Sequence, residues 1–326
     1  MEPTVWGIIG PGKIAGKFAR ALAMVEGASL GAVASRDAAR AETFAREHGV
    51  PGTFANYEDL AADPAIDAVY IATPHGFHAE HSLLCLRRGK GVLCEKPMAL
   101  SAGQVSGMIE ASRKHHAFLM EAMWTRFLPI LREVLTIVES GRIGRLRYIR
   151  ADFGFLAPFN AASRLYDLRL GGGSLLDIGI YPLFLCLQLL GEPDGITAAG
   201  TLSPTGSDET CHAILEYRDG ATAVVSSTLA CQTSLTAEIA GTEGMIRIPG
   251  PWYRNDRFEW NRTGEPAQPV QLEPMVNGFE YQIREAMACM EKGLTESPSL
   301  PHAFSLLMSR TMDEIRRQIG VRYPGE

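Results

Sequence analysis

Short apolar runs alternate with amphipathic helical patterns through the first part of the chain. The runs are nearly continuous in apolar residues, which is typical of strands whose two faces are both covered by helices. They predict strands at Val5–Ile9, Ser29–Ala34, Ala68–Ala72, Val92–Cys94 and Phe118–Met120. The intervening patterns predict helices at Ile14–Met24, Asp37–His48, His78–Arg88 and Ser101–His115. This alternation indicates a doubly wound parallel sheet over residues 1–120.

The pattern changes after residue 120. Helical patterns at Pro129–Ser140 and Ser174–Leu190 flank a long strand-like run at Arg145–Phe155. Shorter runs then predict an antiparallel meander with strands at Thr197–Thr201, Thr210–Tyr217, Thr222–Ala230, Thr236–Gly241 and Met245–Ile248. Two helices, Phe279–Lys292 and His302–Ile319, close the chain and are able to pack back near the first domain. We therefore expect an α/β chain whose second domain, residues 121–326, is an α+β unit with an open, mainly antiparallel sheet.

Composition narrows the classes of function. The 326 residues are 46% hydrophobic and 21% charged, as in a globular protein with a substantial core. A net charge of −6 without a basic run argues against a nucleic-acid partner. We find no signal peptide, no basic amphipathic helix and no apolar segment long enough to cross a bilayer, so we expect a cytoplasmic protein with no membrane partner. The six cysteines are scattered without a CxxC pair, which fits buried thiols in a reducing compartment.

A glycine-rich turn follows the first strand directly and opens the first helix. It reads GPGKIA, a GxGxxA pattern in the strand–turn–helix context of the Rossmann dinucleotide-binding fingerprint. The first glycine permits the tight turn, the second lets a pyrophosphate approach the backbone, and the alanine keeps the helix close to the sheet. A turn without a ligand is the alternative, but the alternating units around it favour dinucleotide binding. The cofactor-binding residues predicted here are Gly10, Gly12, Lys13, Ile14 and Ala15.

The end of the second strand bears on the choice of dinucleotide. An acidic residue there would bind the ribose hydroxyl of NAD. The chain instead has Ser35 and Arg36, with Arg40 one helical turn later, and these side chains suit a 2′-phosphate. We therefore expect NADP, with NAD possible because Asp37 would serve the ribose if the turn were one residue longer. The alternative is that these residues only begin the next helix.

A group of histidines follows another strand that ends at the predicted crevice. Thr73, Pro74 and His75 come first, and His78 and His81 are three residues apart on the next helix. No carboxylate or cysteine has a spacing that would complete a metal site, so we expect no metal. We expect Thr73, Pro74 and His75 beside the cofactor and His78 near the nicotinamide, with plain surface histidines as the alternative.

Further motifs occur in order along the chain. Glu95, Lys96 and Pro97 form an EKP sequence at a strand end, after the GxGxxA turn and the TPxxxH segment. MEAMWTRFLP, GGGSLLDIGIYP, ESPSLP and IRRQIGVRYP follow in the second half. The ordered set resembles the glucose–fructose oxidoreductase/inositol dehydrogenase (Gfo/Idh/MocA) family over nearly the whole chain. It is most similar to the branch of dimeric dihydrodiol dehydrogenases and NADP-dependent xylose dehydrogenases.

The resemblance implies roles for the residues that match its motifs. Lys96 would lie in the active site and help to position the nicotinamide ribose and the substrate, with Pro97 after a cis bond. From the residues themselves we expect Glu95 to be mainly a structural carboxylate that positions the loop, and we expect all three EKP residues to border the cofactor. Tyr181 stands where many members have a histidine, and in the dihydrodiol and glucose–fructose branches this tyrosine donates or accepts the proton. The departure argues against the inositol dehydrogenase type.

The residue chemistry is consistent with those roles. Asp177 and Tyr181 are four residues apart, so a helix would place them on one face. Exchange between a carbonyl and an alcohol needs a group that moves the hydroxyl proton. A free tyrosine has a pKa of about 10, and a cation such as Lys96 would favour its phenolate. We predict a catalytic set of Tyr181, Lys96, Asp177 and His78; alternatively, Tyr181 is a partly buried helix aromatic and Asp177 only orients the helix.

The predicted substrate pocket contains Trp124, Arg126, Phe153 and Phe279, although each aromatic could be an ordinary core residue. Arg147, Arg164 and Arg169 either hold a polar substrate or lie on the surface. The expected substrate is a sugar such as xylose, a trans-dihydrodiol or a dicarbonyl. The alternatives are an anhydrosugar or other sugar reductase of the same family, and a non-catalytic dinucleotide-sensing regulator. The resemblance also implies a homodimer or homotetramer formed through the C-terminal sheet.

Overall fold

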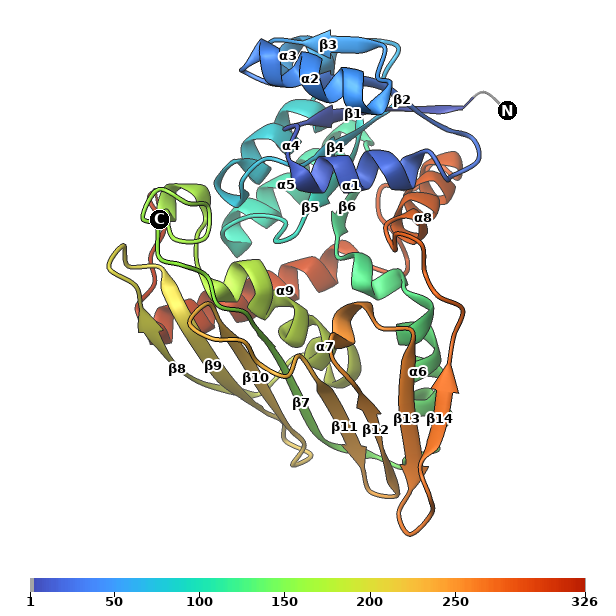
Figure 1. Cartoon of the computed structure of the whole chain (residues 1–326), viewed down its shortest axis with the longest axis vertical. Coiled ribbons are helices and arrows are strands. Elements are labelled where there is room, and N and C mark those ends of the chain that lie inside the picture. Colours follow the sequence, from blue (N-terminus) through green and yellow to red (C-terminus); the bar gives the residue numbers. More distant parts are fainter. Residues whose placement is uncertain (1–2, 326) are drawn as a thin grey trace. The chain divides into compact units, whose positions relative to one another are not determined.

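The computed structural model describes residues 3–325, and within this range the chain forms two sheets with helices packed on them (Figure 1). The chain divides into two compact units. The first contains the residues up to Trp124 together with Val276–Ser309, and the second contains Thr125–Met275 and the residues from Arg310 onward. The predicted division at residue 120 lies close to the first of these boundaries, but Val276–Ser309 belongs with the first unit rather than the second.

The first unit is built on a parallel sheet in which all the neighbouring strands run in the same direction. Its strands, in spatial order, are β3 (Gly52–Phe54), β2 (Ala28–Ala34), β1 (Thr4–Ile9), β4 (Ala68–Ile71), β5 (Gly91–Glu95) and β6 (Leu119–Ala122). The chain reverses its direction of travel across the sheet between β1 and β4. Ligands of doubly wound folds bind beyond the carboxyl ends of the strands at such a switch point.

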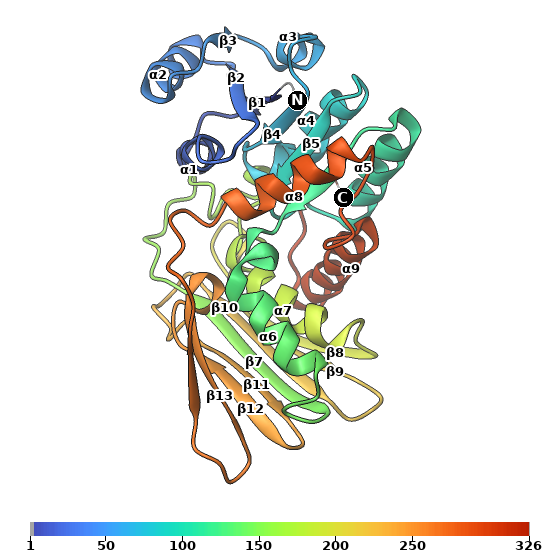
Figure 2. The ribbon, with the colours of Figure 1, turned by 90° about the vertical axis from the view of Figure 1, so that its right-hand side faces the viewer.

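Helices cover both faces of this sheet (Figure 2). One group consists of α1 (Lys13–Leu22), α2 (Ala38–His48) and α8 (Glu280–Glu291), and the other of α3 (Tyr57–Ala62), α4 (His78–Leu86) and α5 (Ala102–His115). The helix ends follow local chemistry. Asp37 caps α2 by accepting a hydrogen bond from the Arg40 amide, and Gly49 ends it with a φ of 66°. Asn56 and Ser101 cap α3 and α5 in the same way.

The doubly wound α/β prediction for this part of the chain is confirmed. The sequence patterns missed β3 and α3, which are only 3 and 6 residues long. Elements this short carry little periodicity, because β3 adds few alternating positions and α3 makes fewer than two helical turns.

The second unit is built on a mainly antiparallel sheet. Its strands, in spatial order, are β14 (Gln268–Gln271), β13 (Arg257–Arg262), β12 (Gly244–Ile248), β11 (Ala237–Gly241), β7 (Leu146–Gly154), β10 (Thr222–Thr228), β9 (Asp208–Glu216) and β8 (Gly195–Leu202). Within residues 3–325, β7 and β10 form its one parallel pair. The sequence patterns missed β13 and β14. β14 is an edge strand containing Pro269, a position where proline is tolerated but weakens the strand pattern.

Helices cover one face of this sheet (Figure 2). They are α6 (Pro129–Glu139), the π-helical turn η4 (Leu175–Gly179) and α7 (Ile180–Leu190). Ala223 and Val225 of β10 are buried on the covered face. The opposite face is open, and Tyr148 of β7 and Ile214 of β9 are 36% and 42% exposed there.

One segment of the second unit, Leu168–Leu190, has the length and apolarity of a membrane span, and its most apolar 18-residue window has a mean hydropathy of 1.6. The prediction that no segment reaches this length was therefore wrong. However, 83% of the segment's most apolar window is buried inside the protein. Its hydrophobicity is accounted for by packing against β7 and β10.

The remaining helical elements are short turns and the last helix. They are η1 (His75–Phe77), η2 (Trp124–Phe127), η3 (Leu168–Leu170), η5 (Trp252–Arg254) and α9 (His302–Ile319).

Candidate active site

The turn after β1 depends on Gly10, whose φ of 93° lies in the left-handed region that favours glycine. A Cβ on Gly10 would lie 2.9 Å from Thr73 Cγ2 and 3.0 Å from the Ala72 backbone, so this turn packs closely against the residues after β4. A Cβ on Gly12 would meet no atom within 4 Å. Gly12 therefore leaves open space at the start of α1, as the approach of a pyrophosphate requires. These residues fit the predicted dinucleotide.

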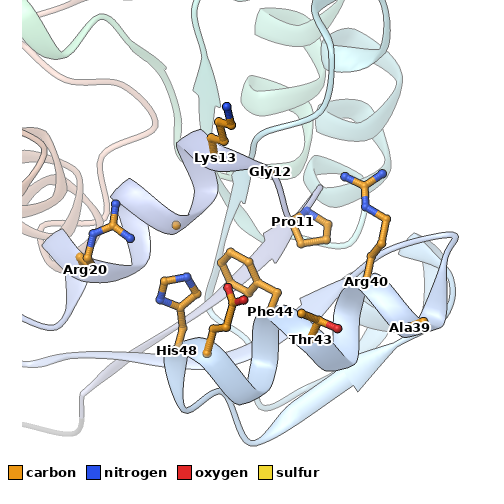
Figure 3. A pocket seen from close by; sticks show the side chains of 11 residues that line it. Pro11, Gly12, Lys13, Arg20, Ala39, Arg40, Thr43, Phe44 and His48 are labelled. Carbon is orange, nitrogen blue, oxygen red and sulfur yellow. The ribbon is translucent and has the colours of Figure 1, made fainter.

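A pocket of about 780 Å³ opens between α1 and α2 beside this turn (Figure 3). Lys13 of α1 and Arg40 of α2 contribute cationic side chains to its wall. Ile14 is 37% exposed, whereas Ala15 is fully buried. The small side chain at residue 15 thus packs inward, as the fingerprint predicts.

At the end of β2, the predicted phosphate ligands and Asp37 have different surroundings. Ser35 is buried, and its Oγ accepts a hydrogen bond of 3.2 Å from the Asp37 amide. The Asp37 carboxylate accepts the Arg40 amide at 3.3 Å and so serves as the cap of α2. The Arg36 guanidinium lies over the Phe77 ring, 5.7 Å from its centroid. Asp37 is thus engaged with its own helix, which favours the two arginines as the groups available to a 2′-phosphate.

His78 joins two of the motifs that the sequence singled out. Its Nδ1 lies 2.7 Å from the carbonyl oxygen of Pro97, and its Nε2 lies 2.8 Å from that of Thr73. Thr73 Oγ1 is also within 3.0 Å of His81 Nδ1, and the His75 ring lies 5.5 Å from the His78 ring. His78 therefore ties the segment after β4, which includes Pro74, to the EKP turn after β5.

The surroundings of His78 shift the pKa of its imidazole in opposite directions. Two carbonyl acceptors favour an imidazolium that donates from both nitrogens, whereas complete burial and the Lys96 charge disfavour it. Burial dominates and lowers the pKa of His78 to about 4. At neutral pH the ring is therefore uncharged and donates one hydrogen bond. The ring of His81 is also neutral, since burial and then Arg36 lower its pKa to about 4.

Glu95 closes β5 and is buried. The Tyr70 hydroxyl donates to its Oε1, and the Lys96 amide donates to its Oε2 at 3.2 Å. Burial raises the pKa of Glu95, while Lys96, the Tyr70 hydrogen bond and Lys17 act in the opposite direction. The Lys96–Pro97 peptide bond is cis. Glu95 thus holds the backbone from which the Lys96 side chain extends.

Glu121 supports the same turn and was missed by the sequence analysis. It lies in β6, where its Oε1 accepts the Met98 amide at 2.9 Å and its Oε2 accepts the Ser305 hydroxyl at 2.7 Å. Burial raises the pKa of Glu121 to about 7, with Glu95 adding to the rise. A carboxylate placed inside the apolar run FLMEAM was the available indication.

Lys17 was also missed, and it brings together two of the predicted pocket aromatics. Its ammonium lies 4.1 Å from the centroid of the Trp124 ring and 4.2 Å from that of Phe279. Both rings are almost fully buried, and they are tilted against each other with centroids 5.2 Å apart. Within the first unit, Trp124 and Phe279 thus form an aromatic clamp around a cation. Arg126 follows Trp124 in η2.

In the second unit, Asp177 lies in the π-helical turn η4 and is 6% exposed. Arg164 donates to its Oδ1 at 2.9 Å, so the carboxylate has a cationic partner. Of the other arginines left open by the sequence, Arg169 pairs with Asp167 at 2.7 Å and Arg147 donates to the Asp219 carbonyl. Arg164 is therefore the one of these three that contacts a predicted catalytic residue.

Tyr181 lies in the first turn of α7, just after η4, and is 6% exposed. Its ring centroid is 5.5 Å from that of Phe153 and 5.2 Å from that of Tyr253, and these two rings stack on each other at 4.3 Å. Tyr253 was missed because it lies in η5, far from the recognisable motifs. The phenol is thus held in an aromatic cluster, with Asp177 one turn before it.

The two units therefore hold different chemical groups. The first supplies the glycine-rich turn, the cations after β2, and Lys96 on its supported turn. The second supplies the phenol of Tyr181 and the paired carboxylate of Asp177. Among residues 3–325, no group of three or more His, Cys, Asp or Glu side chains is arranged to hold a metal ion.

Two family models match the chain. One, described as an oxidoreductase family with an NAD-binding Rossmann fold (GFO_IDH_MocA), covers residues 5–123. The other, described as the GFO/IDH/MocA C-terminal domain, covers residues 131–247.

Relatives resemble the chain over almost its full length. The trans-1,2-dihydrobenzene-1,2-diol dehydrogenase of Xenopus laevis is 40% identical, covering 98% of this chain and 99% of the relative. The human protein of that name is 35% identical, covering 98% of both. Among solved structures, a 3-ketoreductase from Actinomadura kijaniata in complex with NADP and TDP-benzene has a TM-score of 0.88 and 26% identity, covering 98% of each chain. An aldose-aldose oxidoreductase from Caulobacter crescentus has a TM-score of 0.88 and 25% identity, covering 97% of each.

Proposed function

Because the chain belongs to the Gfo/Idh/MocA oxidoreductase family, we propose that it is an NADP-dependent dehydrogenase or reductase acting on a carbon that bears a hydroxyl or carbonyl group. The substrate class is a trans-dihydrodiol, a dicarbonyl or a sugar. The observation that carries this proposal is the 40% identity, over 98% of the chain, to a trans-dihydrodiol dehydrogenase.

NADP is the proposed cofactor, with NAD possible. When bound, its nicotinamide supplies or accepts the hydride. Gly10 would form the turn and Gly12 would leave room for the pyrophosphate to approach the start of α1, and Ser35, Arg36 and Arg40 would hold the 2′-phosphate. The capping role of Asp37 and the NADP complex of the related ketoreductase both support this choice.

Tyr181 is the proposed acid and base. Its hydroxyl would give a proton to the substrate oxygen in the reductive direction and take it back in the oxidative direction. Asp177, paired with Arg164, would orient the helix start from which Tyr181 extends. Lys96 would orient the substrate and the ribose through its three donors. His78 would hold the Lys96 turn through the Pro97 carbonyl.

The test of this proposal is Tyr181→Phe. Its turnover should fall about 100-fold or more with NADP and the best substrate from a panel of sugars, diols and dicarbonyls. Its affinity for NADP, measured by fluorescence titration, should remain close to that of the wild type. Undiminished turnover of this variant across the panel would show that Tyr181 is not the acid and base. Binding of NADP by the wild type without turnover of any panel member would favour a sensing role.

A sugar reductase is the second candidate. The similarity to the 3-ketoreductase and the aldose-aldose oxidoreductase favours it. It differs from the first candidate in the shape of the substrate pocket, so the relative kcat/KM values of sugars and dihydrodiols in the same panel decide between them.

We propose a homodimer or homotetramer that uses the open face of the eight-stranded sheet, where Tyr148 and Ile214 are exposed. Light scattering of the wild type and of Ile214→Lys tests this, because a charge on that face should shift the protein to a smaller species. A cytoplasmic location is also proposed, since the six cysteines are free thiols. Fractionation of the host cell tests the location.

A further inference from the structure

We propose that Asp208 is a positioning residue for the proposed acid and base: together with Ser174 and Ser227 it braces the π-helical turn η4 that carries Asp177 and leads into Tyr181. This inference rests on the proposed role of Tyr181. Asp208 stands at the start of β9, outside the motifs that suggested the function.

The first contact of the brace is at the beginning of η4. Asp208 is fully buried, and its Oδ2 accepts hydrogen bonds from the Leu175 amide at 2.6 Å and the Ser174 hydroxyl at 2.7 Å. The first amides of a helix have no partner within the helix and carry its positive dipole end. A buried carboxylate is therefore a strong acceptor here. It comes from a strand 33 residues further along the chain, so it fixes η4 to the sheet.

Ser227 of β10 contacts both ends of the turn. Its Oγ lies 2.9 Å from the Ser174 Oγ at the start of η4. At the other end, a Cβ added to Gly179 would lie 2.8 Å from the Ser227 Oγ. Residue 179 therefore has no room for a side chain unless Ser227 moves. The two strands β9 and β10 thus hold η4 at its beginning and its end.

The loop before η4 is held in the same way. Gly173 has a φ of 136°, and a Cβ there would lie 2.2 Å from the Asp208 Oδ1. That oxygen is buried and has no hydrogen-bond partner. The Tyr323 hydroxyl donates to the Gly172 carbonyl at 2.8 Å. The backbone of the loop thus packs closely against Asp208, and residue 173 has no room for a side chain.

The brace matters because η4 is π-helical. A π turn has wider i→i+5 hydrogen bonds than an α-helix, is seldom stable by itself, and occurs often at functional sites. It changes the rotation between Asp177 and Tyr181 relative to a regular α-helix, and therefore the direction in which the phenol points. If the acceptor at residue 208 is removed, we expect the turn to relax and Tyr181 to leave its aromatic cluster with Phe153.

The test compares Asp208→Asn, Asp208→Ala and Ser227→Ala with Asp219→Asn, which changes an exposed aspartate in the turn between β9 and β10. We expect kcat to fall about 10-fold in Asp208→Asn, which keeps an acceptor, and about 100-fold in Asp208→Ala. The KM of the substrate and the Kd of NADP should stay within about two-fold, and Ser227→Ala should lie between wild type and Asp208→Ala. Asp219→Asn should behave like the wild type.

A second measurement follows Tyr181 directly. In protein labelled with ¹³Cζ-tyrosine, the Tyr181 signal, assigned by its loss in Tyr181→Phe, should move in Asp208→Asn and stay in place in Asp219→Asn. The brace is overturned if this signal does not move, or if kcat falls only in proportion to a loss of folded protein. Full turnover of Tyr181→Phe would instead overturn the role of Tyr181 as acid and base. The movement of the NMR signal would still test whether Asp208 holds η4 in place.

Discussion

His78 and Pro97 are joined by a hydrogen-bonding contact of 2.7 Å between the imidazole Nδ1 and the proline carbonyl, which links the helix after β4 to the turn that presents Lys96. Replacing His78 by Phe removes the one hydrogen bond that the neutral ring donates to these carbonyls, those of Pro97 and Thr73. We expect a loss of about 1–3 kcal/mol in the free energy of unfolding, measured in urea, and a lower kcat/KM. Glu80→Gln on the exposed side of the same helix is the matched control. Equal stability of the two variants would contradict the linking role.

The same histidine should make the protein less stable in acid. Its pKa is about 4 in the folded state against 6.5 in the unfolded chain, so the unfolded state binds more protons between these values. The free energy of unfolding should therefore decrease as the pH falls from 6.5 towards 4, by up to about 3 kcal/mol from this group. In His78→Gln, urea unfolding at a series of pH values should show a smaller decrease in the free energy of unfolding as the pH falls. A slope identical to that of the wild type would contradict this pKa shift.

Glu121 should act in the opposite direction. Its pKa is about 7 in the folded state against 4.5 in the unfolded chain, so its contribution to stability is complete below 4.5 and is lost as the pH rises through 7. Glu121→Gln keeps an acceptor for the Met98 amide but cannot ionise. Relative to the wild type, the variant should gain up to about 3 kcal/mol of stability between pH 4.5 and pH 8. A constant difference across this range would argue against a buried titrating carboxyl.

Lys17 provides a test of the aromatic clamp. Lys17→Met removes the cation between Trp124 and Phe279 but keeps an unbranched side chain. We expect a loss of about 1–2 kcal/mol in the free energy of unfolding, as for a partly buried cation–π contact. We also expect a further rise in the pKa of Glu95, which Lys17 lowers. Lys17→Arg preserves the charge and should lose less. The idea fails if Met and Arg at this position give the same stability.

Arg36 tests the choice of cofactor. Arg36→Ala should raise the Kd of NADP about 10- to 100-fold and change that of NAD by less than about two-fold, because only NADP has the charged phosphate. Asp37→Asn serves as the comparison, since Asp37 caps α2. If the arginine variant weakens both cofactors equally while Asp37→Asn weakens NAD alone, the aspartate and not the arginine reads the ribose.

Gly173 tests how tightly the loop before η4 is packed. Gly173→Ala requires a positive φ and places a methyl group 2.2 Å from the Asp208 Oδ1. We expect the free energy of unfolding to fall by at least about 3 kcal/mol, from backbone strain and overpacking together. Gly264→Ala is the control, because its φ is also positive but its Cβ would point into open space. The free energy of unfolding of this control variant should fall by only about 1 kcal/mol.

The spacing of residue types along short stretches of the chain was enough to predict most helices and strands and to single out several candidate site residues. The run GIIGPGKIA places a strand, a turn and a helix in direct succession, so both glycines were found from the sequence. Glu95 and Lys96 were found because charged residues directly follow an apolar strand. The proposed roles of Lys96 and Tyr181 came from a resemblance of ordered motifs.

The missed residues act through contacts between segments that are distant in the chain. Glu121 is connected to Ser305, Lys17 to Phe279, and Asp208 to Leu175. No periodicity within one helix or strand reports such a pair, because the partner is chosen by the packing of whole elements. The prediction assumed a regular helix from Asp177 to Tyr181, whereas Asp177 lies in a π turn that leads into α7.

The grouping of Val276–Ser309 with the first unit has a consequence for how the protein is made. During synthesis, β1 to β6 leave the ribosome long before this segment does. Until it emerges, the Leu119 backbone lacks Thr295 and His302 as partners, Glu121 lacks Ser305, and Lys17 lacks Asn277. We therefore expect the first unit to complete its folding only near the end of translation, after the whole second sheet has been synthesised. A nascent chain stalled before residue 276 should be more sensitive to protease than the released protein.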